Sequence, residues 1–414
     1  MGFALLLAVA GGLSVANVYY AQPLLAQIGD ALHVSAGSLG LTTAVTQLGY
    51  LLGLILLVPL GDLVDPRKLI SRLAFAAGIG LTAAGLADGP APFFAACAVV
   101  GVASAVVQVI VAYAAVLSPP ERRGRVLGVV TSGVVLGILL ARTASGLVAS
   151  ALGWRAAFLL PAVVMVVMAA ALSRLPSRPR PQTTPVPYRR LITSVFTLTA
   201  RNRTFRIRSL LALFLFGCFG ALWGSVALPL AEAPWHLSTS QIGLFGIAGA
   251  AGALSASGAG RLADRGRAPL VTGVTLVLLL ASWAAIGTAE FSLPLLIVGI
   301  VVLDFAGQAL HVTNQHLIVA DDPTATSRVI GGYMVYYSLG TGGGAIIATS
   351  LYSAWGWGAV CTFGAAMAVL ALAVWLYELI RPTAGVKQVS DPAPSATPSV
   401  NSVKSRHIRT HARS

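Results

Sequence analysis

A polar stripe within an apolar stretch is the part of this sequence best suited to chemistry. Asp304, Gln308, His311 and Gln315 follow one another at spacings of four, three and four residues, among Leu, Val, Ile and Ala. At about 100° per residue, these side chains share one face of a helix. A carboxyl group beside an imidazole can take up and release a proton. The stripe predicts proton coupling at Asp304 and His311, with Gln308 and Gln315 contacting a solute.

The same residues have a structural alternative, in which Asp304 and His311 form a static pair that holds two helices together. Arg142 is a further charge in an apolar segment, within Leu140-Ala-Arg-Thr-Ala-Ser-Gly146. Facing a cavity, Arg142 would attract an anionic solute or pair with an acidic group. If the apolar segment crosses a membrane, the long side chain of Arg142 could instead reach the outer interface of the bilayer.

Other apolar segments contain polar or aromatic side chains that could contact a solute in a cleft. The substrate-binding candidates among them are Asn17, Tyr20, Gln22, Gln108, Trp223, Tyr333, Tyr336 and Tyr337. Packing between helices is the alternative, and for Tyr19 and Tyr20 so is an aromatic belt at the membrane surface. The sequence has no metal-ligand spacing, no nucleophile with a base, and no phosphate-binding glycine loop, so we expect no enzyme, metal or cofactor.

The composition requires a lipid environment around the elements that position these residues. Hydrophobic residues make up 57% of the 414 residues, and charged residues only 10%, whereas a soluble protein carries about 25% charged residues. Twelve apolar segments are long enough to cross a bilayer as helices. They cover approximately residues 3–27, 37–60, 69–87, 92–117, 126–150, 154–173, 209–231, 241–259, 269–288, 293–319, 329–352 and 356–380.

Positive charge lies on alternate connections between these segments. All 27 Lys and Arg residues except Arg142 and Arg155 fall on one side, together with the C-terminal tail. This bias predicts that both termini are cytoplasmic in a multi-pass protein of the bacterial inner (plasma) membrane. Because the net charge of +14 is spread over many loops, we expect the lipid bilayer and no nucleic acid as a partner.

Two polar clusters repeat the pattern Gly-x-Leu-x-Asp followed by basic residues. One runs Gly61-Asp62-Leu63-Val64-Asp65-Pro66-Arg67-Lys68, and the other Gly260-Arg261-Leu262-Ala263-Asp264-Arg265-Gly266-Arg267. The pattern resembles the signature of the major facilitator superfamily of secondary transporters, although Pro66 stands where that family usually has Arg. The resemblance implies an all-α membrane protein with twelve transmembrane helices in two six-helix bundles.

The two clusters are interpreted as gates, in which a carboxylate caps a neighbouring helix N-terminus and pairs with Arg in one state only. The alternative is a topological turn with positive charges. The gating residues would be Gly61, Asp62, Asp65, Arg67 and Lys68 in the first cluster, and Gly260, Arg261, Asp264, Arg265 and Arg267 in the second.

Weaker repeats extend over the chain, as Gly153-Trp154 and Gly356-Trp357 illustrate. They predict parallel halves related by an axis along the membrane normal. We expect bundles at residues 1–175 and 209–381, a cytoplasmic linker at 176–208 with a possible amphipathic helix, and a disordered cytoplasmic tail at 382–414.

Within the superfamily, drug-proton antiporters usually have an Arg early in the fourth segment and a Gly-Pro pair in the fifth. Here the fourth segment lacks Arg and Ile138 follows Gly137, so that pattern is not met, and Gly133 and Gly137 are interpreted as helix-packing positions. The resemblance implies a monomer that exports a small organic solute by alternating access, coupled to protons. The alternatives are an uptake carrier and a non-transporting membrane sensor or scaffold.

Overall fold

The computed structural model describes residues 2–58, 60–118, 120–174, 198–255, 267–321 and 326–380. Several predictions fall on residues outside these ranges. They are the gating residues Gly260, Arg261, Asp264 and Arg265, the linker up to residue 197, and the tail at 382–414.

The described ranges form helices joined by turns and contain no strand, which confirms the prediction of an all-α protein. The first half comprises α1 (Gly2–Ala16), η1 (Gln22–Leu24), α2 (Leu25–Leu32), η2 (Ala36–Ser38), α3 (Gly40–Leu56), α4 (Leu60–Leu63), α5 (Pro66–Gly85), α6 (Pro90–Ser104), α7 (Val106–Leu117), α8 (Pro120–Leu152) and α9 (Ala156–Leu172). The second half comprises α11 (Arg203–Ser225), α12 (Ala227–Ala231), α13 (Thr239–Ser255), α15 (Ala268–Ile286), α16 (Leu293–Asp321), α17 (Thr326–Trp355) and α18 (Trp357–Ile380).

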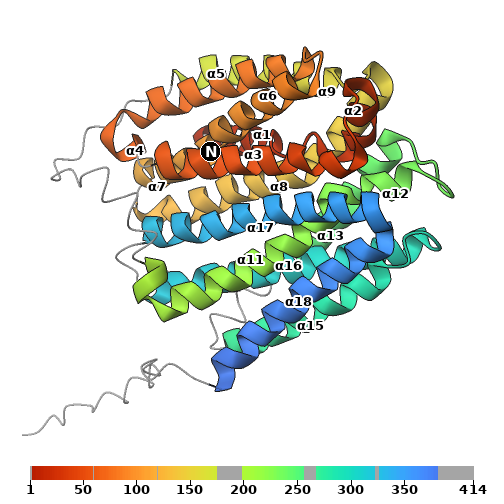
Figure 1. Ribbon diagram of the computed structural model, residues 1–414. Coiled ribbons are helices and arrows are strands. Elements are labelled where there is room, and N and C mark those ends of the chain that lie inside the picture. Colours follow the sequence, from red (N-terminus) through yellow and green to blue (C-terminus); the bar gives the residue numbers. More distant parts are fainter. Residues whose placement is uncertain are drawn as a thin grey trace, which may run out of the picture.

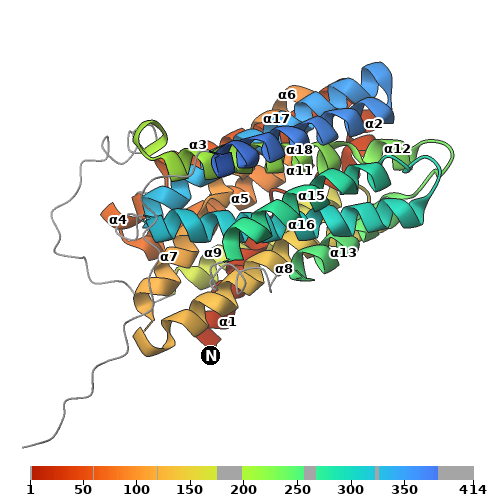
Figure 2. The same cartoon turned by 90° about the horizontal axis from the view of Figure 1, so that it is seen from below.

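The helices pack into two bundles that lie side by side. In Figure 1 the first half, coloured red to yellow, lies above the second, coloured green to blue. Figure 2 views the molecule from the side of the second half, where α15, α16 and α18 lie nearest. The two halves meet where α3 packs against α17 and where α8 packs against α13.

In the described ranges six helical segments are long and apolar enough to cross a membrane, and α8 makes a seventh if its two bent parts form one span. Helices α1 and α9 are apolar but shorter, with 15 and 17 residues. Each of the twelve predicted segments nevertheless coincides with one helix or with consecutive helices. Large apolar side chains such as Leu5, Val163 and Val277 are exposed, as expected for helices that face lipid tails.

The repeated Gly-Trp pair makes the same structure in both halves. Gly153 and Gly356 have φ angles of +86° and +75°, directly after α8 and α17. Glycine adopts this left-handed conformation without strain, so it ends a helix and turns the chain. Trp154 and Trp357, which follow them, are buried.

Two membrane segments contain breaks that apolar length does not reveal. The fourth segment breaks at Ala105, between α6 and α7, and the seventh at Val226, between α11 and α12. The second break has a local cause, because a proline ring clashes with the carbonyl four residues before it. Pro229 lies four residues after Ser225, the last residue of α11.

Small residues allow α8 to approach α1 closely. A Cβ atom on Gly133 would lie 2.7 Å from the carbonyl carbon of Ala8, and one on Gly137 would lie 2.5 Å from the Cα of Gly12. Only glycine fits where two helix backbones come this close. The contact fixes the position of α8 and hence of Arg142, which lies on this helix.

The first polar cluster forms the start of α5. The carboxylate of Asp65 accepts a hydrogen bond of 3.0 Å from the backbone N–H of Arg67 and lies 3.5 Å from its guanidinium. Asp65 therefore caps its own helix, whereas the gate hypothesis places a carboxylate at a neighbouring one. Pro66 explains the difference, since proline favours the first helical position and has no N–H to donate.

Candidate functional site

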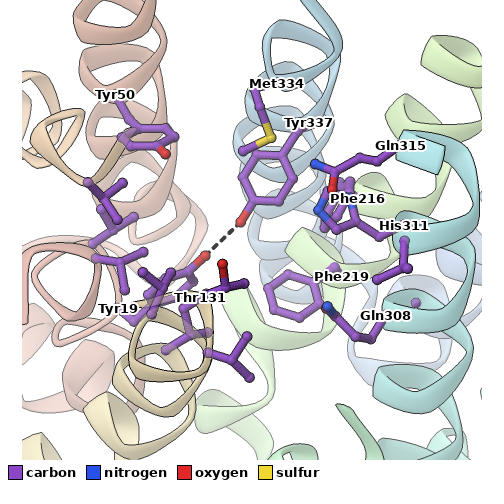
Figure 3. A pocket seen from close by; sticks show the side chains of 18 of the residues that line it. Tyr19, Tyr50, Thr131, Phe216, Phe219, Gln308, His311, Gln315, Met334 and Tyr337 are labelled. Carbon is purple, nitrogen blue, oxygen red and sulfur yellow. Dashed lines mark hydrogen bonds between the residues drawn. The ribbon is translucent and has the colours of Figure 1, made fainter. Parts of the chain in front are cut away.

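A cavity of about 410 Å³ lies between the two halves. Its walls come from α1, α3, α7 and α8 of the first half and from α11, α16 and α17 of the second. Figure 3 shows Tyr50 on one wall facing Gln308, His311 and Gln315 on the opposite wall, with Tyr337 between them. Volumes in this range suit a small organic molecule.

All four members of the polar stripe line this cavity from α16. Asp304 is 7% exposed, and its Oδ1 atom lies 3.4 Å from the indole Nε1 of Trp223, which donates to it. Among the described residues its Oδ2 atom has no hydrogen-bond partner. A buried carboxylate with one free oxygen is a site for a proton or for a donor group of a ligand.

His311 does not contact Asp304 and instead belongs to a separate aromatic group. Its Nδ1 atom lies 3.0 Å from the hydroxyl of Tyr333, and its ring packs edge-on against Phe216 at a centroid distance of 5.2 Å. Asp304 has Trp223 as its partner. The alternative of a static pair between Asp304 and His311 is therefore not formed.

Arg142 turns into the protein, so the alternative in which it reaches the membrane surface is not realised. Its side chain is 2% exposed, and its Nε donates a hydrogen bond of 2.7 Å to the Oε1 of Gln22. The guanidinium carbon lies 3.9 Å from the ring centroid of Trp223, and further contacts reach Tyr19 and Phe219. The aromatic faces stabilise the buried cation.

One hydrogen bond joins the two halves at the wall of the cavity. The hydroxyls of Tyr19 and Tyr337 lie 2.6 Å apart, as the dashed line in Figure 3 marks. Tyr19 follows α1 and lies under the guanidinium of Arg142, while Tyr337 belongs to α17. Tyr19 is buried and is not part of a surface belt.

The substrate-binding candidates divide into two groups. Gln108, Arg142, Gln308, Gln315 and Tyr337 line the cavity, and the others lie outside its lining. Gln22 and Trp223 contact the side chain of Arg142. Asn17, Tyr20 and Tyr333 are buried elsewhere in the protein. The hydroxyl of Tyr336 donates a hydrogen bond of 3.1 Å to the hydroxyl of Thr199.

The cavity also has polar lining residues that sequence reasoning did not single out. Gln47 and Tyr50 both project from α3, and the Gln108 amide donates to the Tyr50 hydroxyl at 3.3 Å. Both amide atoms of Gln47 lack a partner among the described residues, although this side chain is only 1% exposed. The spacing of three between Gln47 and Tyr50 within an apolar segment is a signal that could have identified them.

In the part of the chain that the structure describes, no three His, Cys, Asp or Glu side chains form a group able to hold a metal ion. The three cysteines, Cys97, Cys218 and Cys361, are all free thiols. The described lining offers one carboxylate, one guanidinium, one imidazole, amide and phenol groups, and the hydroxyl of Thr131.

Comparison with known proteins gives matches over almost the whole chain. The family model described as Major Facilitator Superfamily matches residues 7–342 and 225–411. An uncharacterized transporter YgaY from Escherichia coli is 43% identical over 371 residues, which cover 89% of this chain and 94% of the relative. A probable transporter, SCO4007 from Streptomyces coelicolor, is 32% identical over 382 residues, covering 91% of this chain and 87% of the relative.

Two solved structures share the fold at low sequence identity. A bacterial homolog of the human lysosomal transporter Spinster, in an inward-facing and occupied conformation, gives a TM-score of 0.73 at 16% identity and covers 91% of this chain and 96% of that one. The nucleoside transporter NupG gives a TM-score of 0.73 at 15% identity and covers 91% and 99%.

Proposed function

The chain belongs to the major facilitator superfamily of membrane transporters, and on this premise we propose that it exports a small organic solute in exchange for protons, with Asp304 as the proton carrier. The observation that carries the proposal is a buried carboxylate of one half next to a buried guanidinium of the other, in the wall of a central cavity. Ionisable groups inside a membrane protein are costly and mark transport pathways.

The contacts between the halves support alternating access. Thr143 donates to the carbonyl of Gly243 at 3.0 Å, and Thr349 donates to the carbonyl of Gly37 at 3.3 Å. The first contact lies near the start of α13, which follows α12, and the second lies at η2, which follows α2, so both are toward the end where α2 meets α12. Figure 1 shows α2 and α12 on the right. We assign this closed end to the outer face, because the positive charges of the connections favour a cytoplasmic position for the opposite end.

Asp304 can couple protons to this movement through charge. Trp223 contacts both Arg142 on α8 and Asp304 on α16, so the two charges attract each other across the boundary between the halves. Protonation removes the negative charge and with it this attraction. A proton on Asp304 would therefore weaken the contact between the halves at the cavity.

The test is pH-driven transport in proteoliposomes by the wild type, Asp304→Asn and Asp304→Glu. A thermal-shift screen at two pH values first identifies a transported solute. We expect Asp304→Asn to insert in the membrane and to lose pH-driven flux, because its amide cannot exchange a proton. Asp304→Glu keeps a titratable group and should retain part of the flux.

Asp321→Asn is the matched control, since Asp321 ends the same helix but is exposed and accepts a hydrogen bond from Asn202 at 2.7 Å. Its pH-driven flux should equal that of the wild type. Undiminished coupling in Asp304→Asn would rule out the proton-carrying role. Uptake instead of export would appear as accumulation in the opposite direction in vesicles of known orientation.

A further inference from the structure

We propose that the transported solute is a zwitterion, whose anionic group binds Arg142 and whose cationic group binds Asp304. The inference rests on the proposed carrier function and names its substrate class.

Arg142 and Asp304 lie close to each other without forming an ion pair. Among the described residues, ion pairs within 4.0 Å join Arg67 to Asp65 and Arg208 to Glu378, but none joins Arg142 to Asp304. The indole of Trp223 contacts both, with its face toward the guanidinium and its N–H toward the carboxylate. The two opposite charges are thus not neutralised by direct contact with each other.

Each of the two groups has a buried atom without a hydrogen-bond partner. The Nη2 atom of Arg142 and the Oδ2 atom of Asp304 are both buried and have no hydrogen-bond partner in the described structure. Both residues line the cavity. Leaving buried charged groups without partners is unfavourable, so the guanidinium is suited to an anionic acceptor and the carboxylate to a cationic donor.

Charge balance selects a solute that carries both groups. Arg142 and Asp304 are the only Asp, Glu, Lys or Arg side chains in the described lining, and the other titratable groups there are His311 and three tyrosines. A singly charged solute would pair with one residue and leave the charge of the other residue unpaired in a poorly solvated site. A zwitterion satisfies both residues and adds no net charge.

The rest of the cavity indicates an uncharged body for this solute. Phe216 and Phe219 supply aromatic surface, while Gln108, Gln308 and Gln315 supply amide groups. The unpartnered amide of Gln47 offers both a donor and an acceptor on the first-half wall. An apolar or amide-bearing body attached to the dipolar head would fit this lining.

The experiment uses probe sets in which one body carries four charge patterns. The first set is phenylalanine, phenylalaninamide, N-acetylphenylalanine and N-acetylphenylalaninamide, and parallel sets use leucine and glutamine. Affinity is measured as thermal stabilisation of the purified full chain, and exchange as counterflow in proteoliposomes without a pH gradient. For at least one body, we expect the zwitterion to bind roughly tenfold or more tightly than its singly charged forms.

Substitution of each charge should change the preference in opposite directions. Arg142→Gln should gain relative affinity for the cationic amide, and Asp304→Asn for the anionic N-acetyl form. Arg142→Lys keeps the charge, so it should keep the zwitterion preference, which separates loss of charge from loss of folding.

Three results would overturn the inference. They are tighter binding of a neutral or singly charged form for every body, no binding by any zwitterion of the panel, and failure of both charge substitutions to shift the preference. Proton-coupled transport of a neutral solute would sustain the proposed function while contradicting the zwitterion. Counterflow of a zwitterion without pH-driven flux would support the zwitterionic substrate and contradict the proposed proton coupling.

Discussion

At the scale of single residues, the hydrogen bond between Tyr19 and Tyr337 is a direct link between the two halves. Its oxygen atoms are 2.6 Å apart, and both side chains are buried. Tyr19 also lies under the guanidinium of Arg142, with 5.0 Å from its carbon to the ring centroid. The phenol pair is therefore adjacent to the charge that we assign to solute binding.

We expect Tyr19→Phe and Tyr337→Phe each to lower the stability of the protein by about 1 kcal/mol, since each removes one buried hydrogen bond and keeps the ring. The double variant should lose about as much stability as either single variant, because both substitutions remove the same hydrogen bond. Thermal unfolding of the wild type, the two single variants and the double variant measures these losses of stability. Tyr20→Phe, at a buried tyrosine outside the cavity lining, is the control, and strictly additive costs would contradict a direct link.

The site was only partly predictable at this scale. The stripe from Asp304 to Gln315 could be recognised because its polar residues recur with the period of a helix, and it does line the cavity. Periodicity cannot say which residues of other helices face the stripe. The positions of Tyr19 and Gln47 opposite it depend on how the two halves pack.

At the scale of helices, a buried ion pair ties together three elements of the second half. Arg208 on α11 donates to both carboxylate oxygens of Glu378 on α18, at 2.7 and 2.6 Å, and to the hydroxyl of Thr272 on α15 at 3.4 Å. The side chain of Arg208 is 7% exposed and that of Glu378 is 19% exposed. The pair lies within one half and is separate from the cavity lining.

Arg208→Met should lower stability by on the order of 3 kcal/mol, because it leaves the Glu378 carboxylate without its partner. The double variant Arg208→Met with Glu378→Leu should recover much of the loss, since no unpaired charge remains. Thermal unfolding in detergent measures both. Arg206→Met is the control, because Arg206 is exposed and bonds only backbone carbonyls in the described structure; an equal loss there would refute the role of the pair.

The helices were largely predictable, and their interruptions less so. Apolar length places every membrane segment because a bilayer fixes the span that a helix must cover. The breaks at Ala105 and Val226 are invisible to hydropathy, although Pro229 gives a local signal for the second. Asp65 shows a further limit, since the family pattern suggested a contact with another helix, whereas its hydrogen bond in this structure caps the start of its own helix.

At the scale of the whole molecule, the closed end brings the two halves within cross-linking distance. A Cβ atom on Gly37 of η2 would lie 3.3 Å from the Cβ of Ser353 on α17. Disulfide-bonded cysteines have Cβ atoms about 3.5 to 4.5 Å apart. The pair thus suits a reversible covalent lock, once the three native free cysteines have been replaced.

We expect the double variant Gly37→Cys with Ser353→Cys to form a disulfide under oxidation and to lose nearly all transport, because the closed end can no longer part. Reduction should restore the flux. The single variants are the controls, and gel mobility after protease cleavage between the halves measures the cross-link. Full transport by the cross-linked protein would show that this end stays closed throughout the cycle.

Trp223 gives the proposed site an intrinsic optical reporter. An indole with a cation 3.9 Å from its ring centroid and a carboxylate on its N–H sits in a local electric field that shifts its fluorescence emission. Neutralising either charge, by a proton or by a bound solute, changes that field and hence the colour of the emitted light. With the other six of the seven tryptophans replaced, binding and protonation could be followed in real time without an added dye.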